Sequence, residues 1–333
     1  MRKLEDFLKP TQKELFDMLC KMYKGCAAVC KRYYILVRGE APILLAAHLD
    51  TVHNSPVREI CISQDGNVLM SPQGIGGDDR CGVYALATVY EKSKVKPWLL
   101  FTCDEETGCT GARKFAEMHR KGKLPGELEK IKILLEIDRK GKEDAVYYNC
   151  ENPEFEDYIA GKGFKTEVGS FSDISVIAPE LGVAAVNLSS GYYNAHTLHE
   201  YINRRQLDAV VRKVTGIVAE TVGPGFPRYE YIEGFRRCGR WRQKAGKGWS
   251  AGTVPWQLSL AEERAFLKNV PENIRDDYEA LLDYYTVREL EGWRADYGDQ
   301  IIPKICETES GCSYSRYREM ADGETAEKQK EGI

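Results

Sequence analysis

The sequence lacks several features that would assign it to a common class of protein. No apolar run approaches the ~20 residues that a membrane-spanning helix requires. The net charge of −4 over 333 residues gives no general reason to expect binding to nucleic acid or to a membrane. The first residues lead into an amphipathic segment and not into the apolar core of an export signal, so we expect a cytoplasmic protein.

Paired cysteines and abundant histidines are absent as well. The chain has 11 cysteines, an odd number, and none of them forms a Cys-x-x-Cys pair. Without an export signal, this predicts free thiols in a reducing compartment. The histidines are His48, His53, His119, His196 and His199. A metal site can draw its imidazole ligands only from this small set.

The composition is that of a globular protein, with 43% hydrophobic and 29% charged residues. Apolar strands are expected at 43–47, 98–102 and 131–137, and helices at 83–92, 111–120 and 206–221. Buried strands that alternate with helices predict an α/β fold. We expect a three-layer α/β/α sandwich around a mixed, mostly parallel sheet, followed by a C-terminal, mainly helical appendage.

The character of the sequence changes after Thr221, where Gly and Pro residues mark a boundary. We expect a catalytic domain over 1–222, a basic and aromatic linker or strap over 223–258, and a helical appendage with a polar tail over 259–333. Helices are expected near 260–269 and 272–295. The basic segment 235–250 leaves contact with nucleic acid as a less favoured alternative to a solvated linker or a packed strap.

Five segments carry side chains of the types that bind metal ions. They are His48-Leu49-Asp50, Gly76-Gly77-Asp78-Asp79, Asp104-Glu105-Glu106, Ile137-Asp138-Arg139 and Asn194-Ala195-His196. Residues that follow the carboxyl ends of parallel strands meet at one edge of the sheet. Each segment alone has an ordinary explanation, such as a surface ion pair, a turn or a helix cap. Together they would bury several acids at one edge, which is costly unless cations compensate them.

The residue types suit a pair of zinc ions. Zinc accepts imidazole and carboxylate ligands, and two ions about 3.5–4 Å apart need a carboxylate between them. The predicted ligands are His48 on one ion, His196 on the other, Asp78 between them, and Glu106 and Asp138 as terminal carboxylates. Asp50 would orient the His48 ring, and Glu105 would accept a proton from the attacking water. Cobalt or manganese suits the same ligands.

In this order the segments resemble the two-zinc exopeptidase clan. The motifs are His-x-Asp, Gly-Gly-Asp-Asp-Arg-x-Gly, Asp-Glu-Glu-x-Gly, Ile-Asp and Asn-x-His-x-x-x-Glu-Tyr, between about Ile43 and Thr221. The resemblance implies the five metal ligands named above, with Glu105 as general base and Asp50 as the acid that supports His48. Two motifs are similar to those of tripeptidase T and the glutamyl aminopeptidases, which carry an extra domain.

Carboxypeptidase G-like members of the clan carry a lid between the third acid and the last histidine. Here the segment between Asp138 and His196 is short and has the pattern of ordinary core elements. The chain is therefore most similar to the lidless aminopeptidases of metallopeptidase family 28. His199 is an alternative to His196, which we favour because it occupies the family position.

Other residues near these motifs are candidates for substrate contact. They are Arg139, Ser172, Asp173, Tyr193 and Asn194, with simple loop packing as an equal alternative. His53 and His119 are expected at the surface. The predicted function is a metal-dependent exopeptidase, an aminopeptidase on short peptides, which could form a homo-oligomer. The alternatives are an amidohydrolase or deacylase on the same scaffold, and a binding protein that kept the fold and lost catalysis.

Overall fold

A computed structural model describes residues 2–233, apart from 54, 149, 151 and 170, and residues 270–281, 290, 294 and 298–310. The chain forms two compact units, Met1–Gly234 and Phe235–Ile333. The basic segment 235–250 and the helix expected at 260–269 lie outside the described residues. The division into three domains at 222 and 258 stays a prediction.

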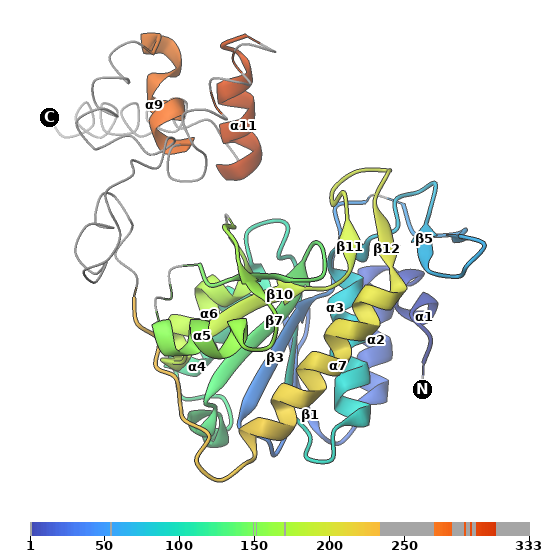
Figure 1. Ribbon diagram of the computed structural model, residues 1–333, viewed down its shortest axis with the longest axis vertical. Coiled ribbons are helices and arrows are strands. Elements are labelled where there is room, and N and C mark those ends of the chain that lie inside the picture. Colours follow the sequence, from blue (N-terminus) through green and yellow to red (C-terminus); the bar gives the residue numbers. More distant parts are fainter. Residues whose placement is uncertain are drawn as a thin grey trace, which may run out of the picture. The chain divides into compact units, whose positions relative to one another are not determined.

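An eight-stranded mixed sheet forms the centre of the first unit (Figure 1). In spatial order its strands are β1 (Ala27–Cys30), β2 (Tyr34–Val37), β6 (Trp98–Thr102), β3 (Ile43–His48), β7 (Ile133–Arg139), β10 (Ala185–Ser189), β8 (Asp144–Val146) and β9 (Lys165–Thr166). The strands β6, β3, β7 and β10 are parallel to one another, and antiparallel pairs flank them. Their carboxyl ends therefore lie at one edge, where α/β folds bind ligands.

Strand β3 shows why both faces of the sheet are covered. All six of its residues are buried. Ile43, Leu45 and Ala47 pack into one hydrophobic core, whereas Leu44 and Ala46 pack into the other. Successive side chains of a strand point to opposite faces, so a strand buried on both faces needs a continuous apolar run. That run is what made the strand predictable from the sequence.

Helices cover each face of this sheet (Figure 1). The helices of the first unit are α1 (Glu5–Leu8), α2 (Gln12–Met22), α3 (Gly77–Lys92), α4 (Thr110–Arg120), α5 (Pro153–Ala160), α6 (Asp173–Leu181) and α7 (Arg204–Thr221), with a 3-10 helix at Gly126–Lys130. The buried apolar side chains of α2, α3 and α7 belong to one core, and Phe115 of α4 and Ile174 and Ile177 of α6 belong to the other. The predicted α/β/α arrangement is confirmed.

A smaller antiparallel sheet lies beside the first one. Its strands are β11 (Tyr192–Tyr193), β12 (Tyr201–Asn203), β5 (Val68–Met70) and β4 (Cys61–Ile62), in that order. In Figure 1, β11, β12 and β5 project past the start of α3, near the start of α7. The loop between β11 and β12 carries His196, so one of the predicted metal ligands belongs to the small sheet and not to the large one.

The second unit is helical in its described part. The helices α9 (Glu272–Leu281) and α11 (Ile301–Ser310) share a small core around Ile274, Tyr278 and Ile302. Of the helix expected at 272–295, the structure describes α9 and the single residues 290 and 294. Among the described residues of both units, no helix has the length and apolar character needed to cross a membrane.

Candidate metal centre and active site

The five predicted ligands come from five segments around the carboxyl edge of the parallel strands. His48 ends β3, Asp138 lies near the end of β7, and Glu106 lies in the loop after β6. Asp78 lies in the first turn of α3, and His196 lies in the loop between β11 and β12. Because β6, β3 and β7 are neighbours in the sheet, their ends are adjacent.

The carboxylate of Asp78 lies between the two imidazoles. Its Oδ1 atom is 3.2 Å from His48 Nε2, and its Oδ2 atom is 3.3 Å from His196 Nε2. His48 Nε2 also lies 3.8 Å from Asp138 Oδ1, and His196 Nε2 lies 3.2 Å from Glu106 Oε2. The Nε2 atom of each imidazole thus faces Asp78 and one further acid, an arrangement that suits two ion positions sharing one carboxylate.

The positions of these side chains and a missing hydrogen bond among them also suit a bound cation. Ligand atoms of His48, Asp78 and Glu106 lie within 4.8 Å of one another, and so do those of His48, Asp79 and Asp138. Glu106 Oε1 is buried and has no hydrogen-bond partner among the described residues. A buried carboxylate oxygen without a donor is costly, and a cation beside it would supply the missing partner. The nitrogen and carboxylate donors suit zinc, cobalt or manganese.

The pKa shifts of the site residues also favour a bound cation. Burial raises the pKa of Asp138 well above its usual range, and the Asp78 and Asp79 carboxylates add to the rise. Burial also opposes ionisation of Asp78, but hydrogen bonds with His196 and His48 hold its pKa below its usual range. Hydrogen bonds with Asp78 and Glu106 raise the pKa of His196 to about 10. The raised pKa values of Asp138 and His196 reflect an excess of clustered negative charge, which favours a bound cation.

Asp50 connects His48 to the loop after β6. Its Oδ1 atom lies 3.3 Å from His48 Nδ1. The carboxylate accepts the backbone N–H groups of Glu105 at 3.1 Å and of Glu106 at 3.0 Å. Burial raises the pKa of the Glu105 carboxyl to about 8, with Asp173 and Glu106 adding to the rise. The predicted roles of Asp50 and Glu105 are compatible with these positions.

Two of the candidates for substrate contact are buried. Ser172 and Asp173, at the start of α6, are 0% and 1% exposed. The Ser172 hydroxyl donates to the Glu136 carboxylate, and the Thr102 hydroxyl donates to Asp173. Both side chains therefore bond within the protein beside the site, and their contact with substrate stays a prediction.

The other three candidates lie nearer the surface. The Arg139 Nη2 group donates to the carbonyl of Val168 at 3.3 Å. The Tyr193 hydroxyl donates to Gln206 at 2.7 Å, and its ring stacks on Tyr201. Asn194 is exposed and adopts a positive φ of 56°. A substrate contact by Arg139, Tyr193 or Asn194 also stays a prediction.

Sequence reasoning did not single out Asp79 or Glu200. Asp79 is buried, and its carboxylate accepts the backbone N–H groups of His48 at 3.3 Å and Gly82 at 3.0 Å. Glu200 is buried and accepts the backbone N–H groups of Gly76 and Asp78. Their only signal in the sequence was their place in the motifs Gly-Gly-Asp-Asp and His-x-x-x-Glu-Tyr. The surface position expected for His53 is wrong, because its side chain is 10% exposed and contacts buried Glu200.

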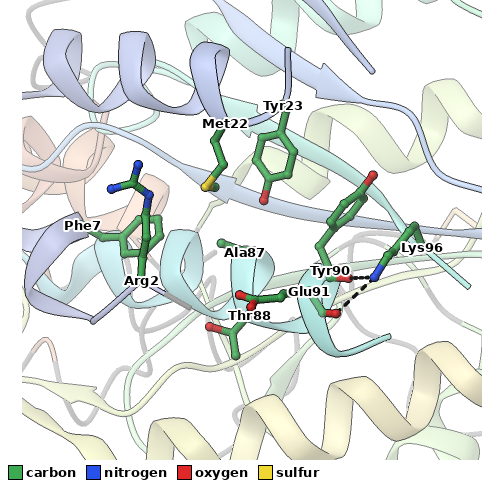
Figure 2. Close-up of a pocket in the computed structure, with 9 residues that line it drawn as sticks. All are labelled: Arg2, Phe7, Met22, Tyr23, Ala87, Thr88, Tyr90, Glu91 and Lys96. Carbon is green, nitrogen blue, oxygen red and sulfur yellow. Dashed lines mark hydrogen bonds between the residues drawn. The ribbon is translucent and has the colours of Figure 1, made fainter. Parts of the chain in front are cut away.

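A cavity of about 340 Å³ lies elsewhere, between α2 and the second half of α3 (Figure 2). Met22, Tyr23 and Tyr90 are among its lining residues. Lys96, at one end, donates to the backbone carbonyls of Tyr90 and Glu91. No predicted site residue lines this cavity, so we place the candidate chemistry at the edge of the sheet.

Comparison with known proteins gives a family match. Residues 35–200 match the family model described as peptidase family M28. The structure of aminopeptidase PepT from Bacillus cereus is similar at 14% identity, with 66% of this chain and 97% of that chain covered and a TM-score of 0.49. An aminopeptidase from Desulfurococcus kamchatkensis is 14% identical over 65% of this chain and 93% of that one, with a TM-score of 0.50. At such identities the likeness concerns the fold alone. No curated protein matches the chain.

Proposed function

Because the chain belongs to peptidase family M28 through residues 35–200, we propose that it is an exopeptidase that uses two metal ions to remove a residue from a short peptide. The specific form of the proposal is an aminopeptidase with two zinc ions. The observation that carries it is the position of Asp78, with one oxygen 3.2 Å from His48 Nε2 and the other 3.3 Å from His196 Nε2. A homo-oligomer and a cytoplasmic location stay predictions from the sequence.

The proposal divides the ligands between two positions. His48 and Asp138 would hold one ion, His196 and Glu106 would hold the other, and Asp78 would contact both. When bound, the ions polarise the scissile carbonyl and make water a stronger acid. Asp50 would support this arrangement without binding an ion. Its carboxylate faces His48 Nδ1 and accepts the backbone N–H of Glu106.

Glu105 is the proposed general base. Its side chain is not among those whose ligand atoms converge, although it neighbours Glu106 in the chain. It would accept a proton from the water that attacks the carbonyl carbon. It would then give this proton to the leaving nitrogen as the carbon–nitrogen bond breaks, so that each proton is accounted for.

A digest of a peptide library by the zinc-loaded protein tests this function, with mass spectrometry of the products. We expect loss of single residues from the amino end of short peptides. Internal cleavage, or no cleavage with zinc, cobalt or manganese, would contradict the proposal. Parallel assays of N-acylated amino acids separate a peptidase from a deacylase, which would cleave these and leave the peptides intact.

A further inference from the structure

The loop between β11 and β12 brings a second side chain to Asp78 besides His196. Glu200 lies at the end of this loop and is 0% exposed. Its Oε1 atom accepts the backbone N–H of Asp78 at 2.9 Å, and its Oε2 atom accepts the backbone N–H of Gly76 at 2.9 Å. One buried carboxylate thus spans two amides of the segment that leads into α3.

His53 provides the third contact of this carboxylate. Its Nε2 atom lies 3.0 Å from Glu200 Oε2. The imidazole also lies against Gly74, where a Cβ atom would come within 2.3 Å of the ring. Gly74 has a positive φ of 83°, so both the ring and the backbone favour glycine there. His53, in the segment after β3, therefore also holds the Glu200 carboxylate in place.

The backbone of the segment that Glu200 holds is not helical. Gly76 adopts a left-handed conformation, and Asp78 has non-helical angles of φ −82° and ψ 105°. The first N–H groups of a helix have no acceptor within the helix and need one from elsewhere. A carboxylate is a strong acceptor for such groups, because hydrogen bonds to a charged partner are roughly twice as strong as neutral ones.

We propose that Glu200 is a positioning residue for Asp78, and that the chain of contacts His53–Glu200–Asp78 sets the metal affinity of the site. The inference rests on the proposed function in taking Asp78 as a metal ligand. One loop fixes both parts of this residue: His196 faces its side chain, 3.3 Å from Oδ2, and Glu200 holds its backbone N–H. A shift of this backbone would move the carboxylate away from both imidazoles.

The test replaces Glu200 with glutamine and measures zinc affinity by competition with a chelator. The amide group has the same shape but sets an NH₂ group against one backbone N–H. We expect zinc affinity to fall by about 10–100-fold, as for other partners of metal ligands. The matched control is Glu129→Gln, because Glu129 also contacts a histidine, 3.4 Å from His119 Nε2, but outside the site. Its zinc affinity should equal that of the wild type.

Amide hydrogen exchange in the metal-free protein gives a second readout. In Glu200→Gln, the amides of Gly76 and Asp78 should exchange faster than in the wild type, while the amides of β3 should not change. A purely structural role would lower the melting temperature without this local pattern. Unchanged zinc affinity together with unchanged exchange at both amides would overturn the inference.

A second variant covers the case in which Glu200→Gln does not fold. His53→Leu keeps the glutamate and removes one hydrogen bond to it, so zinc affinity should fall by about tenfold. Wild-type affinity in a folded His53→Leu protein would then overturn the inference. These readouts do not depend on hydrolysis. A wild type that binds zinc and cleaves no peptide would contradict the proposed function alone.

Discussion

The carboxylate of Asp50 accepts a hydrogen bond from the backbone N–H of Glu105 at 3.1 Å. The same oxygen, Oδ1, lies 3.3 Å from His48 Nδ1, and the other oxygen accepts the N–H of Glu106 at 3.0 Å. One acid therefore links the end of β3 to the loop after β6. The position of the proposed base relative to the ligands depends on this link.

Replacing Glu105 with glutamine should leave metal binding intact and remove most activity. The amide keeps the shape of the side chain but accepts no proton, so kcat should fall by about 10²–10⁴-fold. Steady-state kinetics on aminoacyl-anilides, together with metal analysis of the same sample, provide the measurement. Near-normal turnover in this variant would show that Glu105 is not the base.

The variant Asp50→Asn should weaken both catalysis and metal binding. One of its amide hydrogens would face a backbone N–H of Glu105 or Glu106, so the loop should shift. Partners of metal ligands typically contribute about 10–100-fold to affinity or activity, and we expect a loss of that size. Asp65→Asn is the matched control, because this acid is exposed in the turn between β4 and β5. Equal losses in both variants would argue against a specific role.

Removing the metal should destabilise the protein. Asp78 and Asp138 lie close together and are largely buried, so the ionised form of Asp138 is unfavourable without a cation. A ligand at 100 times its Kd stabilises the folded state by about 2.7 kcal/mol, so the melting temperature should fall on chelation and recover with zinc. Calorimetry with and without a chelator measures this. An unchanged melting temperature would contradict a metal site at these acids.

Arg80 should stabilise the protein without a part in catalysis. It is 4% exposed, and its Nη1 group donates to the carbonyls of Phe7 at 2.9 Å and Pro10 at 2.8 Å. In Arg80→Met these carbonyls lose their partner, which should lower the free energy of unfolding by roughly 1–3 kcal/mol. Urea denaturation measures it, with exposed Arg113→Met as the control. Equal stability in both variants would contradict this role.

The fold was predictable where apolar pattern and secondary structure agree. Strand β6 has the expected bounds, and α7 buries the expected stripe from Leu207 to Val218. Helix α3 begins at Gly77, ahead of the expected residue 83, because the polar and glycine-rich sequence there has no helical apolar period. Element ends that depend on tertiary contacts were thus the less predictable part.

The candidate site also has parts that the sequence predicts and parts that it does not. His48, Glu106 and Asp138 lie together because residues at the ends of adjacent parallel strands share an edge of the sheet. Asp78 and His196 reach the same place from the start of α3 and from the loop between β11 and β12. The partial burial of His53 was not predictable, since its contact is with Glu200, which comes from a distant segment. For Ser172 and Asp173 the sequence left substrate contact and loop packing as equal alternatives, and their hydrogen bonds to Glu136 and Thr102 could not be read from it. Such pairings between distant segments have no local sequence pattern.

The central claim is that Asp78 is shared by two metal ions. Crystals of the zinc-loaded protein, measured at the zinc absorption edge, test it directly through an anomalous difference map. We expect two peaks about 3.5–4 Å apart, one beside His48 and Asp138 and the other beside His196 and Glu106, with Asp78 between them. A single peak, or peaks away from Asp78, would contradict the claim.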